Sequence, residues 1–136
     1  MNTTRRISLL LLCSLAACGG ADQAAPRPNT PTPPPAAAPS AASEQEAKEM
    51  FQSLCSTCHG TTGNGDGPGA AAINPKPRSF SDAAWQASVT DEHIQKVIVY
   101  GGAAVGKSPF MVANPQLKGK TDVLAALTKI VRSYRK

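Results

Sequence analysis

The amino-acid sequence predicts an all-α domain whose helices are joined by long irregular loops. Apolar residues recur at the spacing of a helix in three stretches, residues 47–54, 94–98 and 123–134. Between them lie segments rich in glycine and proline, which interrupt regular elements. No strand–helix–strand pattern surrounds the central cysteines, so a parallel sheet is not expected.

The chain has 136 residues, enough for one ordinary domain at most. Proline and alanine crowd its first third. We therefore expect the folded part to be residues 44–136, and a domain of this size has only a modest hydrophobic core.

Residues 1–17 have the organisation of a signal peptide. Arg5 and Arg6 precede an apolar run that is too short to span a bilayer as an ordinary helix. The run ends in two alanines and Cys18, which resembles a bacterial lipobox, where the cysteine becomes a lipidated N-terminus. A plain secretory signal cleaved elsewhere is the alternative. We expect a lipid anchor on the periplasmic side of a bacterial membrane, and Gly19, in place of an aspartate, favours the outer membrane.

Residues 18–43 follow as the lipidated cysteine and a linker of alanine, proline, threonine and serine. Such a composition cannot bury enough apolar surface to fold, so we expect an extended, disordered segment. The linker could be a passive spacer, or a tether that lets the domain move between membrane-bound partners. Both roles need the same extended chain, so both remain open.

The first helix is predicted from its cap and its apolar stripe. Ser43 and Glu46 fit a capping box, and the helix should run to about Thr57. Its apolar face is expected to comprise Ala47, Met50, Phe51 and Leu54.

Three more helices are expected after a glycine-rich loop over residues 60–77. Ser81 or Asp82 can cap a short helix at residues 83–86. The next should start at Thr90, end at two glycines and face inward with three residues: Ile94, Val97 and Ile98.

The last helix is predicted to be capped by Thr121, after a second long loop over residues 103–118. Its broad apolar face comprises Val123, Leu124, Leu127, Ile130, Val131 and Tyr134.

The motif Cys55-Ser56-Thr57-Cys58-His59 indicates the attachment site of one c-type haem. Positions three apart share a helix face, so both thiols can reach the two vinyl groups along one haem edge. His59 is then held beneath the iron as its proximal ligand.

Three other interpretations of these cysteines are weaker. A thioredoxin-like pair needs a strand–helix–strand setting. A zinc site needs four ligands, and His93 is the one remaining candidate among the usual soft ligands. A disulfide across three helical residues would be strained.

These residues resemble the single-domain class I c-type cytochromes of bacteria. The resemblance rests on the haem motif, on Met111 in a loop before the final helix, and on the two terminal helices. It implies about four helices wrapped around the haem, with a helix crossing packed by three residues: Ala47, Phe51 and Tyr134. It also implies that the carbonyl of Pro68 accepts the imidazole N–H of His59 and fixes its tautomer.

Met111 is the expected sixth ligand, because a soft, neutral thioether favours ferrous iron and suits electron transfer. The alternative is that Met111 packs in the loop and does not bind iron. His93 is the rival ligand, although a histidine at the domain rim is the simpler interpretation. The family also places Arg and Trp near the haem propionates, which implies that role for Arg78 and Trp85; a surface charge and a core anchor are the alternatives.

We therefore expect a monomeric electron carrier, not an enzyme, whose partners are redox proteins such as a reductase or a terminal oxidase. A fixed subunit of a larger oxidoreductase complex, and a haem sensor or peroxidase-like enzyme with a labile sixth ligand, are the alternatives. Nucleic acid is not an expected partner, because the formal charge of +5 falls to +3 once Arg5 and Arg6 are removed.

Overall fold

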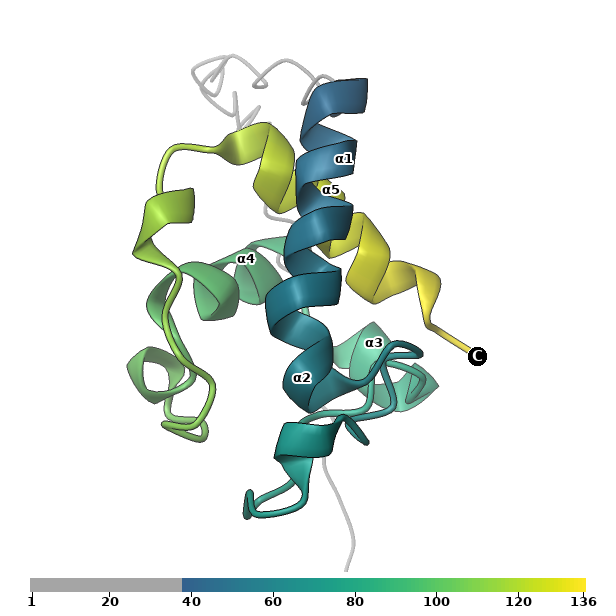
Figure 1. Cartoon of the computed structure of the whole chain (residues 1–136), viewed down its shortest axis with the longest axis vertical. Helices are drawn as coiled ribbons and strands as arrows, with labels where there is room; N and C mark the ends of the chain where they lie inside the picture. Colours follow the sequence, from purple (N-terminus) through teal and green to yellow (C-terminus); the bar gives the residue numbers. More distant parts are fainter. Residues whose placement is uncertain (1–37) are drawn as a thin grey trace, which may run out of the picture. The chain divides into compact units, whose positions relative to one another are not determined.

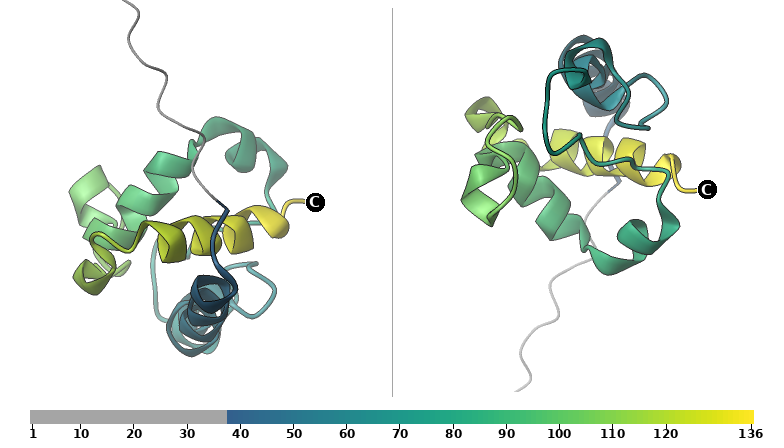
Figure 2. Two further views of the ribbon diagram at one scale, coloured as in Figure 1. Left: turned by 90° about the horizontal axis from the view of Figure 1, so that it is seen from above. Right: turned by 90° about the horizontal axis from the view of Figure 1, so that it is seen from below.

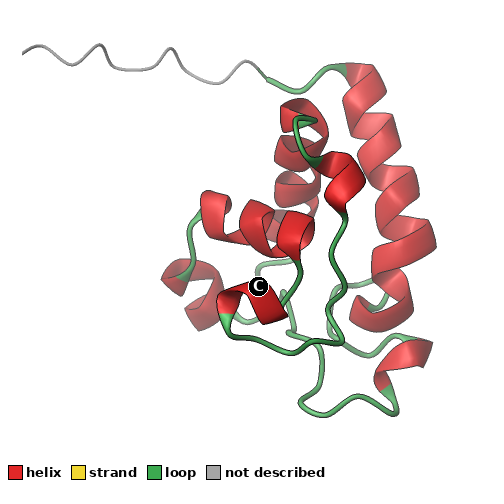
Figure 3. Cartoon of the chain, turned by 90° about the vertical axis from the view of Figure 1, so that its left-hand side faces the viewer, coloured by secondary structure: helices red, strands yellow, loops and turns green. Residues whose placement is uncertain are grey.

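The computed structural model describes residues 38–136, and its regular elements there are all helical (Figure 3). The predicted all-α class is confirmed. The predicted signal peptide, the lipidated Cys18 and most of the linker lie outside the described residues. Within the described part, no helix combines the length and the apolar character needed to cross a membrane.

The chain folds into a first helical run of three consecutive parts. These are α1 (Ala41–Met50), η1 (Phe51–Cys55), which is one turn of π-helix, and α2 (Ser56–His59). The predicted N-cap was wrong. Ser40 is extended and its hydroxyl accepts a hydrogen bond from the Ser43 amide at 3.2 Å, so the helix begins three residues before Glu44.

The π-helical turn also corrects the predicted apolar stripe. Leu54 lies seven residues after Ala47, so in a regular α-helix it would face the core. The wider turn holds an extra residue, as the bond from the Ser56 amide to the Phe51 carbonyl shows. Cys55 therefore packs against the core cluster, and Leu54 is 54% exposed.

Two helices follow the glycine-rich loop. In α3 (Ala83–Ser88), the Asp82 carboxylate caps the Trp85 amide at 3.0 Å. In α4 (Asp91–Tyr100), the Thr90 hydroxyl accepts from the His93 amide at 3.2 Å, as predicted.

The inward face of α4 is broader than predicted. Ile94 is buried and Ile98 packs on the core, but Val97 is only half-buried and Val99 is buried instead. The reason is that α4 packs against α5 on one side and against the 3-10 turns η3 (Ala103–Val105) and η4 (Pro115–Leu117) on another.

The last helix, α5 (Thr121–Ser133), starts without a side-chain cap. The prediction that Thr121 caps it was wrong, because Thr121 is already the first helical residue and Lys120 holds the cap position. The Lys120 carbonyl accepts the Leu124 amide at 3.0 Å.

The core forms where α5 passes across α1 (Figure 1). Seen from above, α1 is nearly end-on while α5 runs across it (Figure 2), so the two helices cross steeply. Ala47 is fully buried, and the rings of Phe51 and Tyr134 lie 5.6 Å apart. The predicted packing of these three residues is therefore confirmed. The small Ala47 side chain lets the two helices approach closely.

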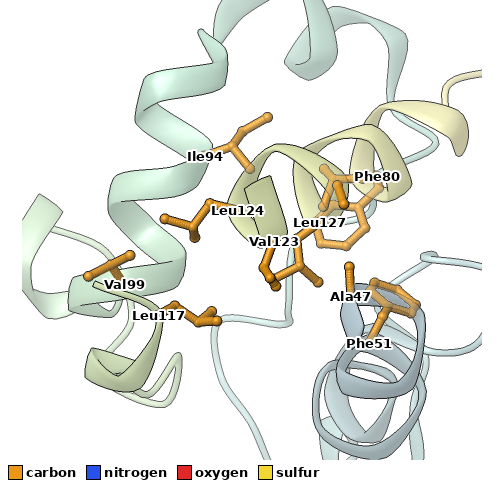
Figure 4. Close-up of a cluster of buried hydrophobic side chains, with 11 residues drawn as sticks. Ala47, Phe51, Phe80, Ile94, Val99, Leu117, Val123, Leu124 and Leu127 are labelled. Atoms are coloured by element: carbon orange, nitrogen blue, oxygen red, sulfur yellow. The ribbon is translucent and has the colours of Figure 1, made fainter. Parts of the chain in front are cut away.

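Side chains of α5 pack between α4 and the first helical run. Figure 4 shows Val123, Leu124 and Leu127 between Ile94 of α4 and the α1–η1 pair Ala47 and Phe51. Two exposed ion pairs tie the outer edge of the crossing: Lys120 to Glu46 at 2.6 Å and Lys129 to Glu44 at 3.3 Å.

Candidate functional site

The two thiols of the motif lie at the end of the first helical run. Cys55 ends η1 and Cys58 lies on α2, three residues later; both are half-buried and neither forms a disulfide. Burial raises the pKa of the Cys55 thiol, and the neighbouring Cys58 adds to the effect. Nowhere in residues 38–136 do three or more His, Cys, Asp or Glu side chains gather as a metal site would require.

His59 is held by the backbone of a distant segment. Its Nδ1 lies 3.2 Å from the carbonyl oxygen of Arg78. Burial lowers the pKa of the imidazole, so the neutral ring donates its Nδ1 proton to that carbonyl. In this tautomer Nε2 carries the free lone pair, so Nε2 is the ring atom that can bind a metal. Two thiols on one helix face, beside an imidazole held in this way, fit a covalently attached haem.

The acceptor of this bond corrects the predicted role of Pro68. Pro68 is exposed and opens the 3-10 turn η2 (Pro68–Ala70), and the His59 bond goes to Arg78 instead. The Arg78 segment runs beside the loop after His59. The Phe80 amide donates to the Gly63 carbonyl at 2.7 Å, and a Cβ on Gly65 would lie 2.4 Å from the Pro77 carbonyl oxygen.

Gly67, in the same Gly-Pro pair, has a different role. Its amide donates to the Cys58 carbonyl at 3.2 Å, so the loop folds back against the end of α2. A Cβ at Gly67 would lie 2.4 Å from the carbonyl oxygens of Ser56 and Thr57. The loop can therefore close on the haem motif only with a glycine at this position.

Met111 is half-buried and tied to the end of α4. Its carbonyl accepts the Gly102 amide at 2.8 Å, and its own amide lies 3.2 Å from the Ser108 carbonyl. Cβ atoms on Gly101 and Gly102 would lie 2.8 Å from the Met111 carbonyl oxygen and 2.2 Å from the Ser108 carbonyl oxygen. The glycine pair thus does more than end the helix: it makes room for the turn that presents Met111.

The model of the cytochrome c family matches residues 44–126 of this chain. The chain belongs to the cytochrome c family. A similar solved structure is the KustC0563 c-type cytochrome, which is 34% identical, with 66% of this chain and 96% of that chain covered and a TM-score of 0.49. No curated protein matches. The family holds haem c covalently and transfers electrons with it, so Cys55 and Cys58 are the attachment residues of this cytochrome.

Arg78 and Trp85 come together in this cytochrome. The Arg78 guanidinium lies 3.1 Å from an Asp82 carboxylate oxygen and 5.9 Å from the centre of the Trp85 ring. Trp85 in turn stacks on Phe80, with ring centres 5.7 Å apart. Their predicted contact with the haem propionates stays a prediction.

His93 lies in the first turn of α4, whereas Met111 is tied to the far end of that helix. Eight residues separate His93 from Gly101, a rise of about 12 Å. The two rival ligands of the cytochrome therefore belong to opposite ends of α4. Which of them binds iron stays a prediction.

A residue that contacts His59, and a second residue that holds it, were not predicted from the sequence. The Phe80 ring stacks on the imidazole of His59 with ring centres 4.4 Å apart and planes 17° apart, and the Gln86 amide donates to the Phe80 carbonyl at 2.8 Å. Phe80 stands alone in a polar loop, outside any periodic stripe. A large apolar residue isolated in such a loop was the available signal.

Proposed function

We propose that this cytochrome carries single electrons between redox proteins, and that His59 and Met111 would be the two protein ligands of its haem iron. The observation that carries the proposal is that His59 and Met111 are held at separate places in the fold. His59 is held by the Arg78 carbonyl, and Met111 by its backbone bond to Gly102. If both side chains bound the iron, no substrate would need to bind it.

The bound haem supplies one chemistry, the uptake and release of one electron by iron between its ferrous and ferric states. The protein's contribution is to hold the two ligands. The Nδ1–H bond to Arg78 raises the electron density of the imidazole, which favours ferric iron. The thioether of Met111 has the opposite effect, because it stabilises ferrous iron. Both ligands would therefore influence the reduction potential, in opposite directions.

The two ligands come from regions that pack on different neighbours. The main packing partners of α2, which ends in His59, are η1 and η2. The segment with Met111 follows α4, whose main partners are η3, η4 and α5. Because α5 packs on both α1 and α4, it links the two ligand-bearing regions. Each of the two regions therefore would contribute one of the proposed ligands.

Sequence features support a place for this carrier at a membrane. The signal-peptide organisation of residues 1–17 and the lipobox-like Cys18 support a lipid anchor on the periplasmic side. Its partners would then be membrane-associated redox proteins, such as a reductase and a terminal oxidase. Metabolic labelling with a radioactive fatty acid, with a Cys18→Ala variant as control, tests the anchor.

Absorption spectroscopy tests the ligands. The protein is exported with haem-maturation machinery and its ferric spectrum is recorded into the near infrared. We expect a Met–iron charge-transfer band that disappears in Met111→Ala and persists in His93→Ala. Loss of the band in His93→Ala alone would contradict the proposed ligand set.

Carbon monoxide binding separates the carrier from a sensor or a peroxidase-like enzyme. The reduced wild-type protein should bind carbon monoxide slowly or not at all, because Met111 fills the sixth position. Met111→Ala should bind it rapidly. Rapid binding by the wild type would favour an enzyme or sensor with a labile ligand.

A further inference from the structure

Gln86 is a buried polar side chain that belongs to no predicted site. It is 4% exposed, and its amide nitrogen donates to two backbone carbonyls, those of Phe80 and Val131, each at 2.8 Å. The side chain therefore joins the loop before α3 to the last helix. Within residues 38–136, no buried side-chain nitrogen or oxygen lacks a partner, so this junction is fully bonded.

Arg132 of α5 holds the other end of Gln86. One guanidinium nitrogen donates to the backbone carbonyl of Gln86 at 2.6 Å and to its side-chain oxygen at 2.8 Å. The remaining donors reach the Val89 carbonyl at 2.7 Å and the Asp91 carboxylate at 2.8 Å. These bonds orient the Gln86 amide so that its nitrogen points to Phe80.

The segment that Gln86 holds contacts the His59 ring at two points. The Phe80 ring stacks on the imidazole at 4.4 Å, and two residues earlier the Arg78 carbonyl accepts the Nδ1–H at 3.2 Å. Phe80 is fixed at its amide by Gly63 and at its carbonyl by Gln86. Movement of Phe80 would therefore change the geometry at both contacts.

We propose that Gln86, oriented by Arg132, is a positioning residue that tunes the reduction potential of this cytochrome through the Phe80 segment and His59. A well-aligned bond to the Arg78 carbonyl makes the imidazole a more basic ligand and favours ferric iron. Loosening the segment weakens that bond and raises the reduction potential. This inference rests on the proposed role of His59 as the proximal ligand.

Two variants test the proposal in the haem-loaded protein, and neither changes the charge near the site. Gln86→Leu removes the donor to Phe80. Arg132→Lys keeps the positive charge but cannot hold Gln86, Val89 and Asp91 together, and it disturbs the fold less. Thr128→Val is the matched control, because Thr128 is the other buried polar residue within residues 38–136 and its hydroxyl donates to the Leu124 carbonyl of its own helix at 2.8 Å.

Three quantities are measured: the reduction potential, the hydrogen exchange of the His59 Nδ1–H by NMR, and the thermal midpoint. In Gln86→Leu we expect a more positive potential and exchange faster on the order of threefold to tenfold, the factor expected for loss of one ordinary hydrogen bond. Arg132→Lys should shift both in the same direction by less. Thr128→Val should lower the thermal midpoint and leave the other two unchanged.

A purely structural role for Gln86 predicts a different pattern. The thermal midpoint would then fall in Gln86→Leu and Arg132→Lys while the potential and the exchange rate stayed at the wild-type values, and this result would overturn the proposal. Failure of the ligand assignment is distinguishable, since the spectrum of His59→Ala would then match that of the wild type. If Gln86→Leu does not fold, Arg132→Lys decides alone.

Discussion

The backbone carbonyl of Arg78 accepts the Nδ1–H of His59 across 3.2 Å, although 19 residues separate them in the chain. The glycines after His59 make this approach possible. The Phe80 amide bonds to Gly63, and the Pro77 carbonyl lies against Gly65, where a side chain would not fit. The effect of replacing a glycine, or of deleting a residue from the first helical run, should therefore depend on its position.

Gly67→Ala should destabilise the haem-loaded protein by about 2 kcal/mol or more, because its Cβ would overlap two carbonyl oxygens of α2. Chemical denaturation measures the change. Gly119→Ala is the control: Gly119 has a positive φ of 88° but open space around its Cβ. It should cost only about 1 kcal/mol, from backbone strain alone. Equal costs at the two positions would contradict the close packing of the loop on α2.

Ala47→Leu should lower the free energy of unfolding by about 1–3 kcal/mol, because a larger side chain overpacks the α1–α5 crossing. Ala47 is fully buried, whereas Ala42 in the same helix is exposed. The same substitution at Ala42 should change stability by less than about 0.5 kcal/mol. A tolerated leucine at Ala47 would show that the helices do not cross as closely as described.

Deletion of Ser53 should be tolerated. Ser53 is exposed within the π-helical turn, which holds one residue more than an α-helix needs. Removing it should convert η1 to regular helix while Cys55 keeps its inward position and haem still attaches. Deletion of the exposed Lys48 within α1 is the control, because Lys48 lies between the buried Ala47 and the haem motif. It should rotate the haem motif by about 100° relative to the residues before it, and haem attachment should fall sharply, as measured by the haem content of the purified protein.

Alkaline destabilisation should depend partly on Tyr134. Burial raises the pKa of its hydroxyl above the ordinary value of 10.0, and the hydroxyl donates to the Thr61 carbonyl at 3.0 Å. The folded state therefore favours the protonated form. This contribution to stability is complete below pH 10 and is lost as the pH rises towards the folded-state pKa. Tyr134→Phe should lose less stability than the wild type between pH 9 and pH 11, measured by urea denaturation at each pH. Parallel curves would contradict the shift.

Absence of haem should cost the protein its cooperative fold. The described domain is small, and a covalently held apolar group would supply much of its interior. The double variant Cys55→Ala, Cys58→Ala, made without haem attachment, should give a broad thermal transition and a weak near-ultraviolet circular dichroism spectrum. The haem-loaded wild type is the control. A cooperative melt of the variant would show that the side-chain core suffices.

Several features of the site were predictable because they depend on local spacing. The haem motif, the capping of α3 and α4, and the glycine end of α4 each involve residues within a few positions of one another. The α1–α5 contact was also predicted, from the resemblance to class I c-type cytochromes rather than from periodicity. The exposure of Leu54 was not predicted, because a regular helical period does not reveal an extra residue in one turn.

The sequence alone determined that the chain is helical and that Cys55, Cys58 and His59 form one haem motif, because three-residue spacing on a helix is a local property. The tertiary structure decided which carbonyl holds His59 and what fixes that carbonyl. Hydrogen bonds between residues up to 46 positions apart join His59 to Arg78, Phe80 to Gln86, and Gln86 to Arg132. Local propensity carries no information about such contacts, since they depend on how the loops pack against the helices.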